Sequence, residues 1–248
     1  MPDPACDRVL YESEAFQRKM FRALAIVQRA LSTSRHPYVA FSGGKDSLAV
    51  TALVHLIDPN VELLWSDDEL EYPESVEYMT RLQHVAGPQF TVTLGHARHA
   101  GWFDPWRDRP YFREPLPGSL NIEMDVDEYQ AMQGYDLTFL GLRRFESGRR
   151  NDHRTAWLLT AGPTYRTAKG VPMKCSPIHD WTADDVWALI SGANLPYNKA
   201  YDVMDSIRLH RNRQRVGPLP LTPRSVLDEG WPDLLERLEA RYQRRWTD

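Results

Sequence analysis

The chain has 248 residues, 42% hydrophobic, 26% charged and 11% aromatic, and its formal net charge at pH 7 is −4. At this length a chain buries enough surface to fold as one large domain, or as one domain with a small appendage, and its two cysteines exclude both a disulfide framework and a four-thiolate iron–sulfur cluster. No apolar run approaches the ~20 residues that cross a bilayer, and the N-terminal residues do not resemble a signal peptide, so we expect a cytoplasmic protein without membrane contact.

The N-terminal part of the chain alternates between helical and strand patterns. Apolar residues recur every three or four positions over residues 13–32, which predicts a helix. Beyond it we expect strands at 38–41, 61–65 and 90–94 and helices at 47–57 and 73–85. This succession is typical of an α/β fold in which a parallel sheet carries helices on both faces.

Residues 97–135 break this rhythm with several prolines and tryptophans, and they predict a long irregular insertion after the third strand, of the kind that forms a binding loop or a lid. The later elements that we expect are a strand at 137–140, a helix at 182–190 that opens on a capping-box pattern, and two helical pieces on either side of 217–223. We therefore expect an α/β domain over residues 1–200 and a helical, basic C-terminal extension over residues 201–248.

Residues 40–47, with the sequence AFSGGKDS, join an expected strand to an expected helix. Two glycines let the backbone turn tightly and present amide groups to an anion, and the start of the helix adds the positive end of its dipole. Lys45 supplies a full positive charge, and Ser42 and Ser47 supply hydroxyl groups. The spacing differs from that of a Walker loop, so the pattern indicates a phosphate-binding turn of another kind.

This loop resembles the PP-loop of the N-type ATP pyrophosphatases, the adenine nucleotide alpha-hydrolase superfamily. The resemblance implies that the loop holds the β- and γ-phosphates of ATP while the bond between the α- and β-phosphates breaks, and that Asp46 helps to hold Mg²⁺. The nucleotide contacts that it implies in the loop are Ala40, Phe41, Ser42, Gly43, Gly44, Lys45, Asp46 and Ser47.

Three further segments resemble the phosphoadenosine phosphosulfate (PAPS) reductase branch of that superfamily. Residues 141–150 (GLRRFESGRR) match its GxRxxESxxR motif, residues 177–198 match its stretch from PxxDW to LPYN, and residues 64–75 resemble its DTG…PET segment. In that last segment Asp67 keeps the acidic position, whereas Asp68 and Glu69 replace Thr-Gly. The additional nucleotide contacts that this resemblance implies are Asp67, Gly141, Arg143, Glu146 and Ser147.

Arg143 and Arg150 are each able to fork onto phosphate or sulfate oxygens, where charge builds up during a displacement. We therefore expect Lys45, Asp46, Arg143 and Arg150 to be the catalytic residues. A surface pair on a helix is the alternative interpretation of the two arginines.

The positions of the cysteines distinguish the reductases from the other branches of this family. Reductases attack sulfur with a C-terminal cysteine, but this chain has none after Cys175, and it keeps the Lys45-Asp46 pair that reductases usually lack. These features favour ATP chemistry on a reductase-like scaffold without an iron–sulfur cluster. Cys175 is either a persulfide carrier or a half-buried structural residue, and Cys6 has no expected role.

The C-terminal part of the chain is basic. Residues 1–140 carry a net charge of −9 and residues 141–248 a net charge of +5, since 12 and 18 basic residues face 21 and 13 acidic residues. We expect anionic ligands here, and a nucleic-acid backbone is one candidate for Arg208, Arg211, Arg213 and Arg215. A solvated helix face is the alternative.

The function expected from these features is an ATP pyrophosphatase that adenylylates an acceptor for sulfur incorporation. DNA phosphorothioation is the first candidate role, and thiolation of a nucleobase or a metabolite is the second. Expected partners are ATP with Mg²⁺, a cysteine desulfurase or another sulfur donor, DNA, and a second copy of the chain. The alternatives are a sulfonucleotide reductase or sulfonucleotide-binding enzyme, and a non-catalytic nucleotide-binding module.

Overall fold

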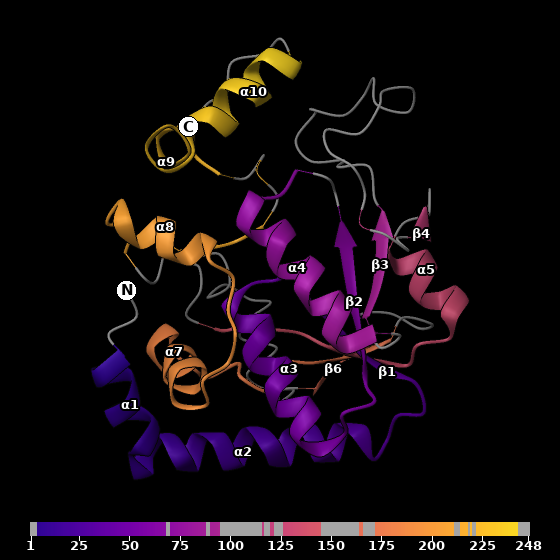
Figure 1. Cartoon of the computed structure of the whole chain (residues 1–248). Helices are drawn as coiled ribbons and strands as arrows, with labels where there is room; N and C mark the ends of the chain where they lie inside the picture. Colours follow the sequence, from indigo (N-terminus) through magenta and orange to yellow (C-terminus); the bar gives the residue numbers. More distant parts are fainter. Residues whose placement is uncertain are drawn as a thin grey trace.

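The protein is a sheet wrapped by helices (Figure 1). The computed structural model describes residues 4–67, 70–87, 90–94, 116, 120–121, 126–144, 164–165, 172–210, 214–217, 219 and 222–242. The helices are α1 (Pro4–Glu12), α2 (Glu14–Leu31), α3 (Lys45–Ile57), α4 (Pro73–Ala86), α5 (Val126–Gln133), α7 (Ala183–Gly192), α8 (Ala200–Ser206), α9 (Arg224–Gly230) and α10 (Pro232–Tyr242). The strands are β1 (Pro37–Ala40), β2 (Glu62–Asp67), β3 (Phe90–Leu94), β4 (Leu120–Asn121), β5 (Leu137–Phe139), β6 (Thr164–Tyr165) and β7 (Met173–Cys175).

Within the described residues, seven strands form one sheet in the order β4-β3-β2-β1-β5-β7-β6. The pairs are parallel, except that β6 runs antiparallel to β7. The expected α/β fold with a parallel sheet is therefore confirmed. The chain moves from β1 out to β4 and then returns to the other side of β1 with β5, so the direction of winding reverses between β1 and β5. Ligands of open α/β sheets bind in the crevice at such a switch point.

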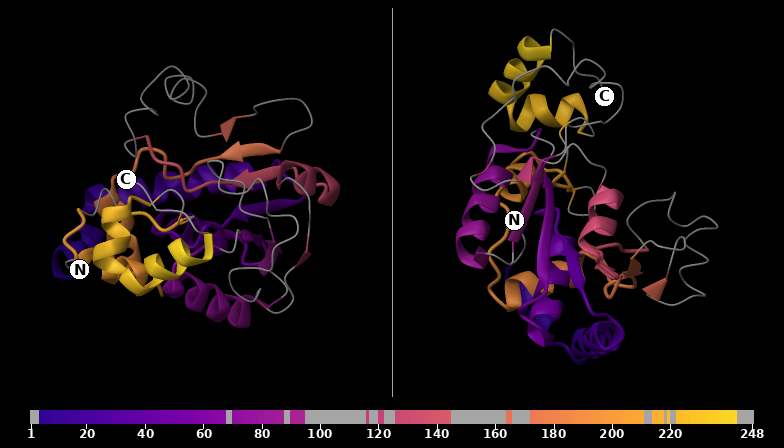
Figure 2. Two further views of the ribbon diagram at one scale, coloured as in Figure 1. Left: turned by 90° about the horizontal axis from the view of Figure 1, so that it is seen from above. Right: turned by 90° about the vertical axis from the view of Figure 1, so that its right-hand side faces the viewer.

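The two faces of the sheet carry different side chains because alternate residues of a strand point to opposite sides. Val39, Leu63 and Trp65 belong to the main core with residues of α2, α3, α4 and α7. Tyr38 and Leu64 form a smaller cluster on the opposite face with Tyr129 of α5 and with Tyr135, which lies between α5 and β5. The right-hand view of Figure 2 shows α4 on one side of the sheet and α5 on the other.

The expected elements of the N-terminal part are confirmed within a few residues. The helix expected at 13–32 is α2, and the strand expected at 90–94 is β3. The helix expected at 47–57 begins at Lys45, so both Lys45 and Asp46 lie in its first turn. The sequence did not predict α1, whose charged and apolar residues are interleaved over only nine positions.

The insertion expected to be irregular contains regular structure. Strand β4 and helix α5 both lie inside residues 97–135, so that part of the prediction is wrong. The proline- and tryptophan-rich composition belongs to the start of the insertion, and residues 95–115 lie outside the described part of the chain. None of the helices in the described ranges has the length and apolarity to cross a bilayer.

The C-terminal extension forms three helices, α8, α9 and α10, and the last two lie beyond the carboxyl ends of β2 and β3 (Figure 1). The extension contacts the segment that follows β2. The Leu219 amide donates to the Leu70 carbonyl at 2.8 Å, and the Trp231 ring lies 4.5 Å from the Tyr72 ring, centroid to centroid. The Trp231 indole N–H also donates to the Glu74 carboxylate. These contacts hold the extension beside the carboxyl ends of the strands, where the loops begin.

Candidate functional site

The loop between β1 and α3 is a tight turn held by its own serines. The Ser47 hydroxyl accepts from the Ser42 amide at 3.2 Å and donates to the Gly44 carbonyl at 2.9 Å. Gly43 has a φ of +72°, and a Cβ atom there would lie 2.5 Å from the Cε of Met79. The turn therefore requires glycine at this position for its backbone conformation, and a larger residue would also displace the flexible end of Met79.

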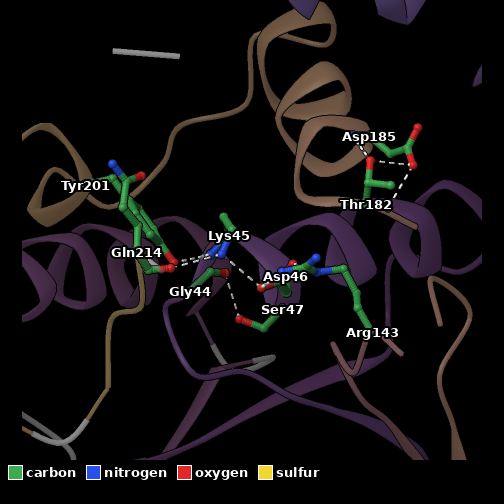
Figure 3. Close-up of polar contacts among 9 residues, drawn as sticks. All are labelled: Gly44, Lys45, Asp46, Ser47, Arg143, Thr182, Asp185, Tyr201 and Gln214. Carbon is green, nitrogen blue, oxygen red and sulfur yellow. Dashed lines mark hydrogen bonds and ion pairs between the residues drawn. The ribbon is translucent and has the colours of Figure 1, made fainter. Parts of the chain in front are cut away.

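Two charged side chains of the first turn of α3 form a cluster with Arg143, which follows β5. The Arg143 guanidinium donates to the Asp46 carboxylate, with its Nε 2.5 Å from Oδ1 and its Nη2 3.4 Å from Oδ2. The Lys45 ammonium lies 3.2 Å from Asp46 Oδ2 on the other side (Figure 3). Lys45, Arg143 and Asp46 are only 2%, 4% and 9% exposed.

This cluster has one more cation than anion. Two buried positive side chains share one carboxylate, and the N-terminus of α3 adds the positive end of a helix dipole. Buried cationic side chains beside a helix N-terminus interact favourably with an anion. The arrangement is therefore suited to bind an oxyanion at the switch point between β1 and β5.

Gly141 lets the loop after β5 approach α3 closely. A Cβ atom on Gly141 would lie 2.7 Å from both the Asp46 carbonyl carbon and the Ser47 amide nitrogen. Both neighbours are backbone atoms of a helix and have little freedom to move. This approach places Arg143, two residues later, against Asp46.

We expect Gly141→Ala to destabilise the protein by about 1–3 kcal/mol, because the added methyl group overlaps backbone atoms. It should also lower anion binding, because it pushes Arg143 away from Asp46. Urea unfolding measures the first effect. The control is Gly217→Ala, because no atom lies within 4 Å of that Cβ position. Equal unfolding midpoints for Gly141→Ala and the wild type would contradict the tight approach.

Two further residues contact the loop from the C-terminal part of the chain, and the sequence did not predict either. The Tyr201 hydroxyl accepts from the Lys45 amide at 2.9 Å, and the Gln214 carbonyl accepts from the Lys45 ammonium at 3.1 Å (Figure 3). The second contact uses a backbone carbonyl, which no residue type marks in a sequence. Tyr201 lies three residues after the matched LPYN segment, and that spacing was the available signal.

The other predicted nucleotide contacts fall into three groups. Ala40 ends β1, and Phe41 is a core residue, so only its backbone is available to a ligand. Asp67 is buried at the carboxyl end of β2, next to β1 in the sheet. The predicted contacts Glu146 and Ser147 and the predicted catalytic residue Arg150 lie outside the described residues, as do Asp68 and Glu69.

The expected magnesium ligand does not fit well. Both oxygens of the Asp46 carboxylate already accept from Arg143, and Oδ2 also accepts from Lys45. A divalent cation at Asp46 would therefore approach two positive side chains. No group of three or more His, Cys, Asp or Glu residues suited to a metal ion occurs within the part of the chain that the structure describes. We assign no magnesium ion to Asp46.

Cys175 has the surroundings of a structural residue. It ends β7, it is fully buried in the main core, and burial raises the pKa of its thiol to about 11. The Thr164 hydroxyl donates to its sulfur over a long distance of 3.8 Å. A sulfur carrier needs an accessible thiolate. The structure therefore favours the structural interpretation of Cys175 over the persulfide carrier.

We expect iodoacetamide at pH 8 to alkylate Cys6 and to leave Cys175 unmodified in the folded protein. Cys6 is exposed, whereas at a pKa of about 11 only about one Cys175 thiol in a thousand is ionised at pH 8. Peptide mass spectrometry measures both sites, and denatured protein, in which both should react, is the control. Comparable labelling of the two cysteines in folded protein would restore the persulfide role.

The basic segment over residues 208–215 ends beside the phosphate loop. Gln214 and Val216 are buried beside Lys45 and Gly44, and Arg215 between them is exposed. Arg208 is also exposed, at the end of α8, whereas Arg211 and Arg213 lie outside the described residues. Arg215 therefore follows directly on a residue that contacts the lysine of the loop.

Residues 36–222 match the family profile described as "Phosphoadenosine phosphosulfate reductase domain". Among curated proteins, an adenosine 5'-phosphosulfate reductase of Oceanobacillus iheyensis is 26% identical over 175 residues, covering 66% of this chain and 65% of that protein. A sulfate adenylyltransferase subunit 2 of Rhizobium meliloti is 22% identical over 201 residues, covering 72% of this chain and 65% of that protein. The chain thus matches a little under two thirds of the length of these relatives.

Two solved structures share the fold. The phosphate complex of the PAPS reductase of Candida auris has a TM-score of 0.55 at 14% identity, covering 79% of this chain and 87% of that one. The FMN adenylyltransferase of Candida glabrata in complex with ATP has a TM-score of 0.52 at 13% identity, covering 75% of this chain and 58% of that one. At these identities the likeness concerns the arrangement of helices and strands alone.

Proposed function

The chain belongs to the phosphoadenosine phosphosulfate reductase domain family, and we propose that within it the protein acts as an ATP pyrophosphatase that transfers AMP to an acceptor. The observation that carries the proposal is the buried cluster of Lys45, Asp46 and Arg143 at the switch point of the sheet. Its excess positive charge is suited to the phosphates of ATP. The relatives named for adenylyl transfer and for a sulfonucleotide support a nucleotide ligand.

The proposed reaction is a displacement at the α-phosphorus of ATP. An acceptor oxygen forms a bond to that phosphorus, the bond from phosphorus to the oxygen shared with the β-phosphate breaks, and pyrophosphate leaves with the electron pair. An ionised phosphodiester oxygen attacks without releasing a proton, whereas a hydroxyl acceptor releases its proton to water. Lys45 and the amides of the loop stabilise the charge on the departing pyrophosphate, while Arg143 stabilises the charge on the α-phosphate. A sulfur nucleophile then displaces AMP from the acceptor.

For the acceptor we propose the DNA backbone first, in a phosphorothioation reaction, and a nucleobase or metabolite second. The exposed Arg215 beside the loop and the exposed Arg208 support a polyanionic acceptor. Such binding would weaken steeply with salt, because phosphate contacts release counterions. The sulfur would come from a cysteine desulfurase or another donor protein. The name of the subunit 2 relatives supports a partner subunit, and a homodimer is a further possibility for the assembly.

The main competing function is a sulfonucleotide reductase, which the family match favours. That chemistry needs a thiolate that attacks sulfur, whereas the two cysteines here are Cys6 near the N-terminus and the buried Cys175. The deciding experiment incubates the protein with ATP, and separately with PAPS and reduced thioredoxin. We expect pyrophosphate and AMP from ATP. Sulfite from PAPS, without pyrophosphate from ATP, would overturn the proposal.

A further inference from the structure

Asn198, the last residue of the LPYN segment, joins three parts of the site. Its side-chain Nδ2 donates to the Ser75 hydroxyl at 2.8 Å and to the Gly43 carbonyl at 3.4 Å. Its Oδ1 accepts from the Ala200 amide at 3.0 Å. Asn198 is only 1% exposed. One buried amide therefore connects the phosphate loop to the starts of α4 and α8.

The contact with Gly43 fixes the direction of a loop amide. In a trans peptide the carbonyl and the N–H of the same plane point in opposite directions. When Asn198 holds the Gly43 carbonyl on its side, the Gly44 N–H points the other way, where it donates to the Ser42 hydroxyl at 3.4 Å. Glycines on both sides of this peptide leave its orientation unrestricted by side chains. The Ser42 hydroxyl holds the N–H of this peptide from within the loop, and Asn198 holds its carbonyl from outside.

Tyr201 acts on the next peptide in the same way. The Lys45 amide donates to its hydroxyl at 2.9 Å, and the carbonyl of that peptide, on Gly44, accepts from the Ser47 hydroxyl and from the Leu48 amide. The turn over residues 198–201 thus holds two consecutive peptides of the loop. Neither contact uses a charged group, so the turn sets geometry without adding to the charge of the site.

We infer that Asn198 is a positioning residue, which orients the Gly43–Gly44 peptide so that its amide is directed toward the phosphates of the ligand. The inference rests on the proposed function insofar as it takes the ligand to be a phosphate compound. It gives a role to the LPYN segment, which contains none of the proposed catalytic residues. It also makes the phosphate affinity of the loop depend on a side chain that lies 155 positions away in the sequence.

Binding of inorganic pyrophosphate by calorimetry tests this role. We expect Asn198→Asp and Asn198→Ala to weaken pyrophosphate binding by about tenfold or more, because the loop amide loses its fixed direction. Asn198→Asp has nearly the same shape as the native residue and keeps the acceptor for Ala200, but as a carboxylate it no longer donates to Gly43. The matched control is Tyr197→Phe in the same motif, whose lost hydrogen bond goes to Asp202 and not to the loop.

The melting temperatures of the Asn198 variants show whether weak pyrophosphate binding comes from a lost positioning contact or from a destabilised fold. A folded Asn198→Asp protein that binds pyrophosphate as the wild type does would overturn the inference. If both Asn198 variants fail to fold, Ser75→Ala provides the test, because it removes the anchor of the Asn198 amide and leaves Asn198 in place. We expect it to weaken pyrophosphate binding by about threefold or more, and unchanged binding would show a purely structural role. A wild type that binds pyrophosphate but releases none from ATP would refute the proposed reaction and leave the positioning role intact.

Discussion

Lys45→Ala is expected to lower kcat/KM for pyrophosphate release from ATP by about 1000-fold, as the loss of a preorganised charge at a reacting phosphate does in other sites. The lysine is 2% exposed and is held between the Asp46 carboxylate and the Gln214 carbonyl. Because charge accumulates on pyrophosphate as it leaves, we expect the loss mainly in kcat rather than in KM. A continuous assay of released pyrophosphate measures both.

The control for this variant is Lys199→Ala, which removes a lysine whose side chain is 60% exposed and is paired with Asp202 at the surface. It should leave kcat/KM within about twofold of the wild type. The same pair of variants separates an enzyme from a non-catalytic nucleotide-binding module. If Lys45→Ala keeps the biological role of the protein in cells, the enzyme is the wrong interpretation and the module is favoured.

Asp46→Asn is expected to destabilise the protein by about 3 kcal/mol, the cost of leaving buried charges without their partner. Arg143 and Lys45 would then share a neutral amide in a site where both are almost fully buried. Thermal or urea unfolding measures the loss. Asp233→Asn, at an exposed position in the first turn of α10, is the matched control and should stay within about 0.5 kcal/mol of the wild type.

Pyrophosphate should recover part of this loss. An anion supplies the negative charge that the Asp46→Asn variant lacks, so saturating pyrophosphate should raise its melting temperature more than that of the wild type. This result is specific to a charge-balancing role. If pyrophosphate stabilises the variant less than the wild type, Asp46 contributes to anion binding in another way, and the account of the cluster as an anion site with excess positive charge is wrong.

The phosphate loop was predictable because its signals are local. A strand, two glycines, a lysine and a helix follow one another within a few residues, and the structure keeps that order from β1 to α3. The Gly141–Arg143 segment was likewise predictable from its position directly after an expected strand, since the carboxyl ends of parallel strands share one edge. Both segments lie at the switch point of the sheet.

The partners of these residues were not predictable in the same way. Asp46 and Arg143 were each assigned to a ligand, whereas the structure pairs them with each other across 97 positions. Their pairing depends on the approach of Gly141 to α3, which only the assembled sheet reveals. The contacts from Tyr201 and Gln214 depend on how the C-terminal extension packs against the sheet, and the sequence carried no signal for that packing.

The contacts between the C-terminal extension and the phosphate loop also determine when the site forms during synthesis of the chain. The hydrogen bonds that Tyr201 and Gln214 form with Lys45 join residues 156 and 169 positions apart. A nascent chain that has emerged only as far as β5 has its phosphate loop and Asp46, but it lacks the Tyr201 hydroxyl and the Gln214 carbonyl that contact Lys45. Pairings of such long separation form late, after closure of a large loop of chain. The nucleotide-binding site would therefore be complete only after nearly the whole polypeptide has left the ribosome.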